Sequence, residues 1–166
     1  MMFLRMVLLG VIALTFSACN RGEVADIQRN PEGGVDVSVK FTETEVNEIV
    51  TEALSRTENP LLRTPTIDLQ NGTMIVRGEH ERRDGSGTIR GSLSLTITVQ
   101  NGALTATITQ ADIDGISLTD SSIQDLNARL AENFTQRANR ENRQITFTSV
   151  FIRDTELEIN FNAQRS

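Results

Sequence analysis

Residues 35–54 read VDVSVKFTETEVNEIVTEAL, and the spacing of their apolar side chains changes once within this stretch. In the first half the apolar residues occupy every second position, which predicts a half-buried β-strand. Beyond Thr42 they recur three and four residues apart, which gathers them on one face of a helix that we expect to end near Arg56. Thr42 and Glu45 have the spacing of a capping box. The sequence therefore predicts a strand that leads directly into a capped amphipathic helix.

A second and longer helix is expected towards the C-terminus. Leu118 precedes Thr119, a candidate N-cap, and Ile123 follows four residues later, which repeats the pattern seen at the first helix. Apolar residues then continue at helical spacing through Ala138. We expect one face of this helix to be buried.

Alternating apolar segments separated by turn residues predict three β-hairpins. Two lie between the helices and one follows the second helix. The paired segments are 66–69 with 74–78 around Asn71-Gly72, 93–99 with 104–108 around Asn101-Gly102, and 145–152 with 157–161 around Asp154-Thr155.

The order of these elements favours the α+β class, because no alternation of strand and helix of the parallel type is present. Serine and threonine fill the other positions of segments such as 92–99, which suits an antiparallel sheet with one wet face and one apolar face. We expect a single domain, residues 35–166, in which a curved antiparallel meander sheet of about six to eight strands packs against the two amphipathic helices as a half-barrel.

The N-terminus has the pattern of an export signal. Residues 1–18 carry Arg5, an apolar run and then Ser17-Ala18 directly before Cys19. The run is about a dozen residues, too short to span a bilayer. The residues before Cys19 are similar to a bacterial lipobox, with Phe16 where an aliphatic residue is usual. They predict a lipoprotein anchored through Cys19 to a bacterial membrane outside the cytoplasm. The alternative is an ordinary secretory signal that leaves Cys19 as a free thiol.

Residues 19–34 are polar, contain Pro31, and show no apolar periodicity. This composition predicts a flexible tether between the lipid and the domain. About fifteen flexible residues have a root-mean-square reach of roughly 20 Å.

The composition argues against nucleic-acid binding. The formal net charge is −6, Lys40 is the single lysine, and the chain has neither Trp nor Tyr. Nucleic-acid binding normally requires basic patches and aromatic stacking residues, so no nucleic-acid partner is expected.

No combination of residues predicts an enzyme, a cofactor or a metal. His80 is the single histidine and lies in a charged segment, where a solvated side chain is expected. Asp112, Asp114 and Asp120 cluster before the second helix, but they lack the twelve-residue loop of an EF-hand and are accounted for by helix capping.

The organisation of residues 35–163 resembles the LmeA-like group of bacterial envelope proteins and, more loosely, small lipoproteins of the tubular lipid-binding (TULIP-like) superfamily. The resemblance rests on the segment opening the first helix (41–46), the hairpin 67–78, the segment 113–118 and the ending Leu157-Glu158-Ile159. It implies non-catalytic binding of a lipid or other apolar ligand in a groove between the helices and the sheet. The candidate ligand-binding residues are Ile49, Ala53, Leu61, Leu62, Leu126, Leu130 and Phe134.

Two hypotheses for function stay open at this point. One is a lipid-anchored protein that binds an apolar ligand. The other is a structural or adaptor lipoprotein whose core is fully packed and which holds no ligand. An apolar helix face is more often core than pocket, so the candidate residues alone do not decide between them.

Overall fold

The computed structural model describes residues 22–56, 60–82, 84–139 and 144–164, which form eight strands and two helices. Cys19 and the predicted signal lie outside the described residues. The elements in chain order are β1 (Glu23–Arg29), β2 (Val35–Thr42), α1 (Glu43–Ser55), β3 (Arg63–Gln70), β4 (Thr73–Glu81), β5 (Thr88–Gln100), β6 (Ala103–Asp112), α2 (Ser121–Ala138), β7 (Gln144–Ile152) and β8 (Glu156–Gln164).

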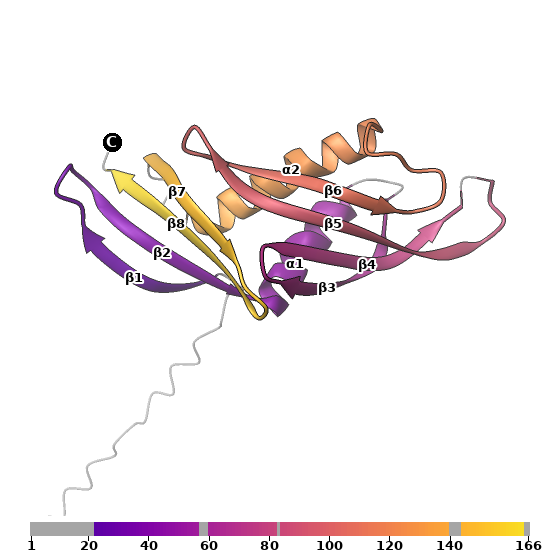
Figure 1. Cartoon of the computed structure of the whole chain (residues 1–166), viewed down its shortest axis with the longest axis horizontal. Coiled ribbons are helices and arrows are strands. Elements are labelled where there is room, and N and C mark those ends of the chain that lie inside the picture. Colours follow the sequence, from indigo (N-terminus) through magenta and orange to yellow (C-terminus); the bar gives the residue numbers. More distant parts are fainter. Residues whose placement is uncertain (1–21, 57–59, 83, 140–143, 165–166) are drawn as a thin grey trace, which may run out of the picture.

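The strands form two antiparallel sheets rather than one meander (Figure 1). The central sheet has the order β3-β4-β5-β6, and in it each strand pairs with its neighbour in sequence. The terminal sheet has the order β1-β2-β8-β7 and joins the two ends of the domain. The α+β class and the strand number are as predicted, whereas the single curved sheet is wrong. Hairpin patterns specify local pairs, and they carry no information on the pairing of β2 with β8.

Two backbone hydrogen bonds join the sheets. The amide of Gly72, in the β3–β4 turn, donates to the carbonyl oxygen of Ile152 at 2.9 Å. The amide of Phe147 donates to the carbonyl oxygen of Gly102, in the β5–β6 turn, also at 2.9 Å. The Asn-Gly turns of the central sheet therefore abut β7, the edge strand of the terminal sheet.

The first helix begins as predicted. The Thr42 hydroxyl accepts a hydrogen bond from the Glu45 amide, and the Glu45 carboxylate accepts one from the Thr42 amide, which completes a capping box. The second helix differs from expectation, because its N-cap is Asp120 and not Thr119. The Thr119 amide instead bonds to the hydroxyl of Ser117 within the preceding turn, and this local bond delays the start of the helix by one residue.

Both helices pack mainly on the central sheet and on each other (Figure 1). Helix α1 lies against β3, and α2 lies against β6 and α1. Phe41 at the end of β2 packs on Phe134 of α2, and the two rings meet edge to face with centroids 6.5 Å apart. Both rings are fully buried, as are most apolar residues of the two helices. No helix in the described part of the chain is long and apolar enough to span a membrane.

Strand β1 lies within the segment predicted to be a flexible tether, so that prediction is wrong for residues 23–29. Its two larger apolar residues, Val24 and Ile27, are three apart, a spacing that matches no strand pattern. A β-bulge between Val24 and Asp26 absorbs the extra residue, so Val24 faces Val39 and Ile27 faces Val37 across the β1–β2 pair.

Candidate functional site

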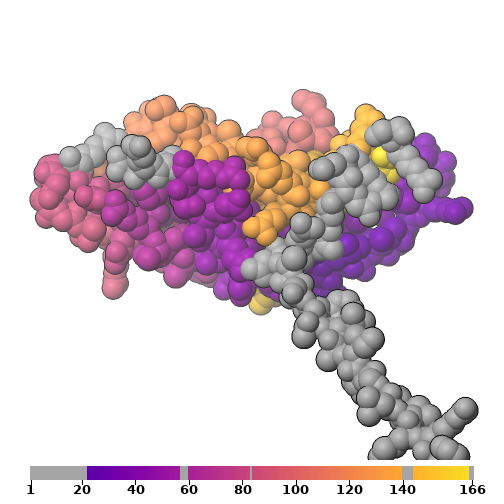
Figure 2. Space-filling view, turned by 180° about the vertical axis from the view of Figure 1, so that it is seen from behind, coloured from indigo at the N-terminus to yellow at the C-terminus, as the bar shows by residue number. Residues whose placement is uncertain are grey.

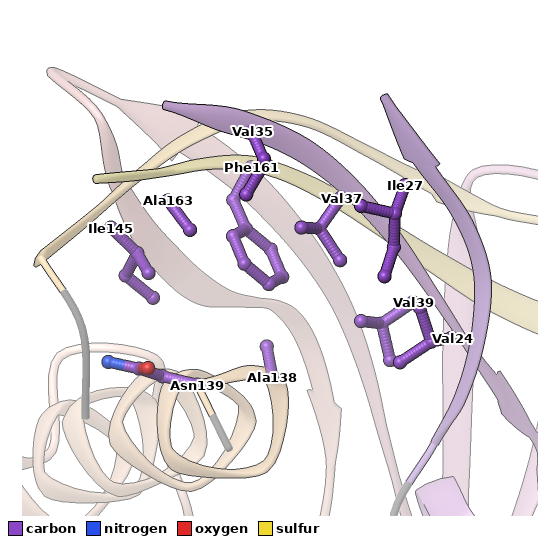
Figure 3. Close-up of a pocket in the computed structure, with 10 residues that line it drawn as sticks. All are labelled: Val24, Ile27, Val35, Val37, Val39, Ala138, Asn139, Ile145, Phe161 and Ala163. Atoms are coloured by element: carbon purple, nitrogen blue, oxygen red, sulfur yellow. The ribbon is translucent and has the colours of Figure 1, made fainter. Parts of the chain in front are cut away.

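An apolar pocket lies between the terminal sheet and the C-terminal end of α2 (Figure 3). Its volume is about 250 Å³. The lining side chains come from all four strands of the sheet and from the end of the helix: Val24, Ile27, Val35, Val37, Val39, Ala138, Asn139, Ile145, Phe161 and Ala163. Asn139 is polar and all the others are apolar.

Sheet geometry explains why these side chains converge. Val35, Val37 and Val39 occupy alternate positions of β2 and therefore project from one face. On the neighbouring strand β8, Phe161 is the partner of Val37 and Ala163 is the partner of Val35. Figure 3 shows these side chains pointing towards the end of α2, which closes the space from the other side.

The end of α2 forms the floor of the pocket. Ala138 is its last residue and is buried, while Asn139 is the C-cap, whose amide donates to the carbonyl oxygen of Thr135 at 2.9 Å. The amide of Asn139 is therefore used within the helix end. The floor presents one methyl group and one carboxamide to an otherwise hydrocarbon wall.

The edge strand β1 supplies the exposed rim. Ile27 is 63% exposed, the largest value among the exposed large apolar side chains of the described residues. Val24, on the same face of β1, is partly buried and packs against the core. The pocket with its apolar lining, rather than the single exposed isoleucine, is what is typical of a ligand site.

The residues predicted to bind a ligand lie elsewhere. All seven are buried members of the core cluster, and none lines the apolar pocket: Ile49, Ala53, Leu61, Leu62, Leu126, Leu130 and Phe134. Leu61 also lines a second, polar cavity. The pocket residues had a signal in the sequence, the alternation of valines in 35–39, which sequence reasoning assigned only to a strand.

The prediction of a solvated His80 is wrong. The side chain is buried at 7% exposure, and its Nδ1 atom lies 2.9 Å from the carbonyl oxygen of Leu61. The sequence around it is charged, but β4 directs alternate residues inward, and His80 follows Met74, Val76 and Gly78 on the inner face.

The aspartates before α2 do not assemble a cation site. Asp112 and Asp114 are exposed, and the Asp120 carboxylate accepts a hydrogen bond from the Ser117 amide at 2.9 Å. Among the described residues, no group of His, Cys, Asp and Glu side chains is arranged to hold a metal ion.

Comparison with known proteins adds little. No protein-family model matches the chain, and no curated protein matches it. Among solved structures the chain is similar to one titled "Crystal structure of lipopolysaccharide binding protein", with 12% sequence identity and a TM-score of 0.23. The match covers 85% of this chain and 44% of that chain, so this chain spans less than half of its length. The family resemblance therefore stays a prediction.

Proposed function

We propose that this protein is a lipid-anchored protein of the bacterial envelope that binds an apolar chain, without catalysis, in the pocket between the terminal sheet and α2. The observation that carries the proposal is the pocket itself, about 250 Å³ of space with an almost wholly apolar lining and an exposed isoleucine at its rim. The anchor is inferred from the sequence of residues 1–19.

The size of the pocket limits the ligand. An almost wholly apolar lining offers water few hydrogen-bond partners, so the space favours hydrocarbon over water. Sites for drug-sized molecules measure about 300–1,000 Å³. The pocket therefore fits part of a single acyl chain better than a lipid with two chains.

The energetics of such binding are those of hydrocarbon burial. Each methylene group transferred from water contributes about 0.8 kcal/mol. A chain held in this way needs no polar partner inside the pocket, whose lining is apolar apart from Asn139. Binding is expected to select for chain length more than for head group.

Displacement of a fluorescent apolar probe tests the pocket directly. The mature chain, residues 19–166, would carry Cys19→Ser so that no covalent lipid competes. Val37→Trp fills the pocket and should abolish probe and fatty-acid binding. Val150→Trp is the matched control, since Val150 is a partly buried valine of the same sheet that does not line the pocket. Thermal unfolding of both variants shows that they are folded.

Two further variants sharpen the assignment. Ile27→Ser changes an exposed rim residue and should weaken binding about fivefold, equivalent to about 1 kcal/mol. Phe134→Leu changes the core and should lower stability while leaving affinity unchanged. Equal affinity in the Val37→Trp and Val150→Trp variants would show that the apolar chain binds elsewhere.

Native mass spectrometry separates this function from its alternative. Protein purified without its signal should retain a co-purifying lipid or fatty acid. A bare mass, together with failure to bind any chain, would favour a structural or adaptor lipoprotein. In cells, Cys19→Ser should release the protein from the membrane fraction, and retention there would contradict the lipid anchor.

A further inference from the structure

A second cavity lies at the opposite end of α2 from the apolar pocket. It has a volume of about 470 Å³ and a mixed lining that includes Arg63, His80, Glu81, Arg82 and Ser122. Ser122 is the second residue of α2, whereas Ala138, the last residue, belongs to the apolar pocket. At about 1.5 Å per residue the two ends are roughly 25 Å apart. The second cavity is therefore a separate site.

The tautomer of His80 follows from its one hydrogen bond. Its Nδ1 atom lies 2.9 Å from the carbonyl oxygen of Leu61, and a carbonyl oxygen can only accept, so Nδ1 carries the proton. In the neutral ring Nε2 then presents a lone pair. This atom is buried and has no hydrogen-bond partner among the described residues. A buried polar atom in this state is destabilising unless a ligand or water pairs with it.

The N-terminus of α2 borders the same cavity, where Ser122 is among the lining residues. The Asp120 side chain does not cap the helix and instead accepts from the Ser117 amide, and the first turn contains no acidic residue. The amides of Ile123 and Gln124 already bond to the Asp120 carbonyl oxygen. The Ser121 and Ser122 amides precede them, at the end of an 18-residue helix whose dipole favours an anion.

Two guanidinium groups complete the lining. Arg63 is held by Glu81, with Nη2 and Oε2 2.6 Å apart. Arg82 follows the end of β4 and is exposed at the same cavity. Together Arg63, Arg82 and Glu81 leave the lining with one net positive charge, beside the helix end and the buried imidazole.

We propose that this cavity binds a phosphate monoester or inorganic phosphate. Such a group offers oxygens that accept from Arg63, Arg82 and the first amides of α2. Inorganic phosphate also retains a P–OH group near neutral pH, and a monoester, whose second pKa is about 6, retains one in its monoanionic form. That hydroxyl donates to Nε2 of His80, a buried acceptor that has no partner among the described residues. Sulfate has the same shape and no proton to donate, and a phosphodiester has no P–OH either. The cavity therefore discriminates between phosphate monoesters and both of these groups.

The single histidine of the chain makes the test direct. In a long-range ¹H–¹⁵N correlation spectrum of the full chain, the imidazole signals belong to His80 without further assignment. We expect the Nδ1-protonated tautomer in the free protein and a change of the Nε2 shift on titration with inorganic phosphate. Sulfate at the same ionic strength should leave the shift unchanged. A free protein in the Nε2-protonated tautomer, or an equal response to sulfate, would overturn the proposal.

Variants separate recognition from general charge effects. Arg82→Gln should weaken phosphate binding about tenfold in calorimetry. Arg153→Gln, an exposed arginine of the β7–β8 turn that does not line the cavity, is the matched control and should not change it. His80→Asn keeps a donor for the Leu61 carbonyl and removes the second nitrogen, so it should reduce the preference for phosphate over sulfate. Equal losses in the Arg82 and Arg153 variants would overturn the proposal.

The source of the phosphate is decided by two probes. If inorganic phosphate alone shifts the Nε2 signal, a soluble phosphate occupies the cavity. If only vesicles of phosphatidylcholine doped with phosphatidic acid shift it, the ligand is a lipid head group. If neither probe has an effect, the proposal fails. Val37 does not line this cavity. A failure of phosphate binding can therefore be distinguished from a failure of apolar-chain binding in the other pocket.

Discussion

The side-chain amide of Asn133 in α2 donates a hydrogen bond of 3.3 Å to the carbonyl oxygen of Ile49 in α1. Asn133 is only 2% exposed, and its Oδ1 atom has no hydrogen-bond partner among the described residues. A buried polar residue thus bridges the two helices, in addition to the more exposed Glu52–Arg137 ion pair. It secures a single contact and leaves one oxygen unsatisfied.

Replacing Asn133 tests how its hydrogen bond and its unpaired oxygen each affect the free energy of unfolding. Asn133→Leu should leave the free energy of unfolding unchanged or raise it by up to about 1 kcal/mol, because it removes an unpaired oxygen and Ile49 keeps its helical hydrogen bond. Asn133→Asp should lower it by more than about 2 kcal/mol, since it buries a charge. Urea denaturation measures both. A similar loss in the two variants would show that the Oδ1 atom is paired after all.

Gly22 provides a test of the ordered N-terminal strand. A Cβ atom at this position would lie 2.6 Å from Cε1 of Phe41 and 2.7 Å from the carbonyl oxygen of Lys40. Gly22→Ala should therefore destabilise the protein by about 1–3 kcal/mol. Glu23→Ala, at the next and exposed position, should stay within about 0.5 kcal/mol. If this segment were a free tether, the alanine at position 22 would have no effect on unfolding.

The capping box of α1 allows the same substitution to be compared at two sites. Thr42→Ala removes the N-cap and should lower the free energy of unfolding by about 1 kcal/mol. Thr51 is exposed within the same helix and only bonds back to the Asn47 carbonyl oxygen at 2.7 Å. Thr51→Ala should stabilise the protein by a few tenths of a kcal/mol, because alanine is the better helix former. Thermal unfolding should shift in opposite directions for the two variants.

The ionisation of Glu52 makes the stability of the helix pair depend on pH. Hydrogen bonds from Arg56 and then Arg137 hold the pKa of its carboxyl below the ordinary value. A lowered folded-state pKa stabilises the protein above the unfolded-state pKa of about 4.3, and this contribution is lost as the pH falls through the lower, folded-state value. The carboxylate is 42% exposed, so the contribution is expected to be below about 1 kcal/mol. Glu52→Gln should flatten the acid limb of stability against pH, and an unchanged limb would contradict the coupling.

Local features were predictable from the sequence because they are encoded by neighbouring residues. The strand-to-helix switch at Thr42 and the Asn71-Gly72 and Asn101-Gly102 turns each depend on a few adjacent side chains. The pairing of β2 with β8 depends on residues more than a hundred positions apart, and no local pattern specifies it. The division into two sheets was therefore missed.

The candidate site was missed for a different reason. Amphipathic helix faces predicted buried residues correctly, but burial against a sheet is not the same as lining a pocket. The pocket is made where β1 extends the sheet beyond the reach of α2, and the bulge after Val24 hides that strand from any periodic pattern. His80 was misjudged because its charged neighbours in sequence point outward while it points inward.

The ordered start of the chain also sets a length scale. Only three Cα steps, about 11 Å when fully extended, separate Cys19 from Gly22, whereas a free segment of about fifteen residues would have a reach of roughly 20 Å. A lipid on Cys19 would thus hold the start of β1 within about 11 Å of the attachment point. Any load on that anchor would act first on β1, which carries Val24 and Ile27 and pairs only with β2 among the described strands. The membrane attachment and the pocket wall would then be one mechanical unit, in which tension on the anchor loosens the grip on the bound chain.

The space-filling surface shows how the elements are distributed along the long axis of the domain. Seen from behind, β1 and β2 lie at one end of the long axis and the β4–β5 hairpin lies at the other (Figure 2). The apolar pocket, which β1 and β2 help to line, and the cavity beside His80, at the end of β4, lie towards these two ends.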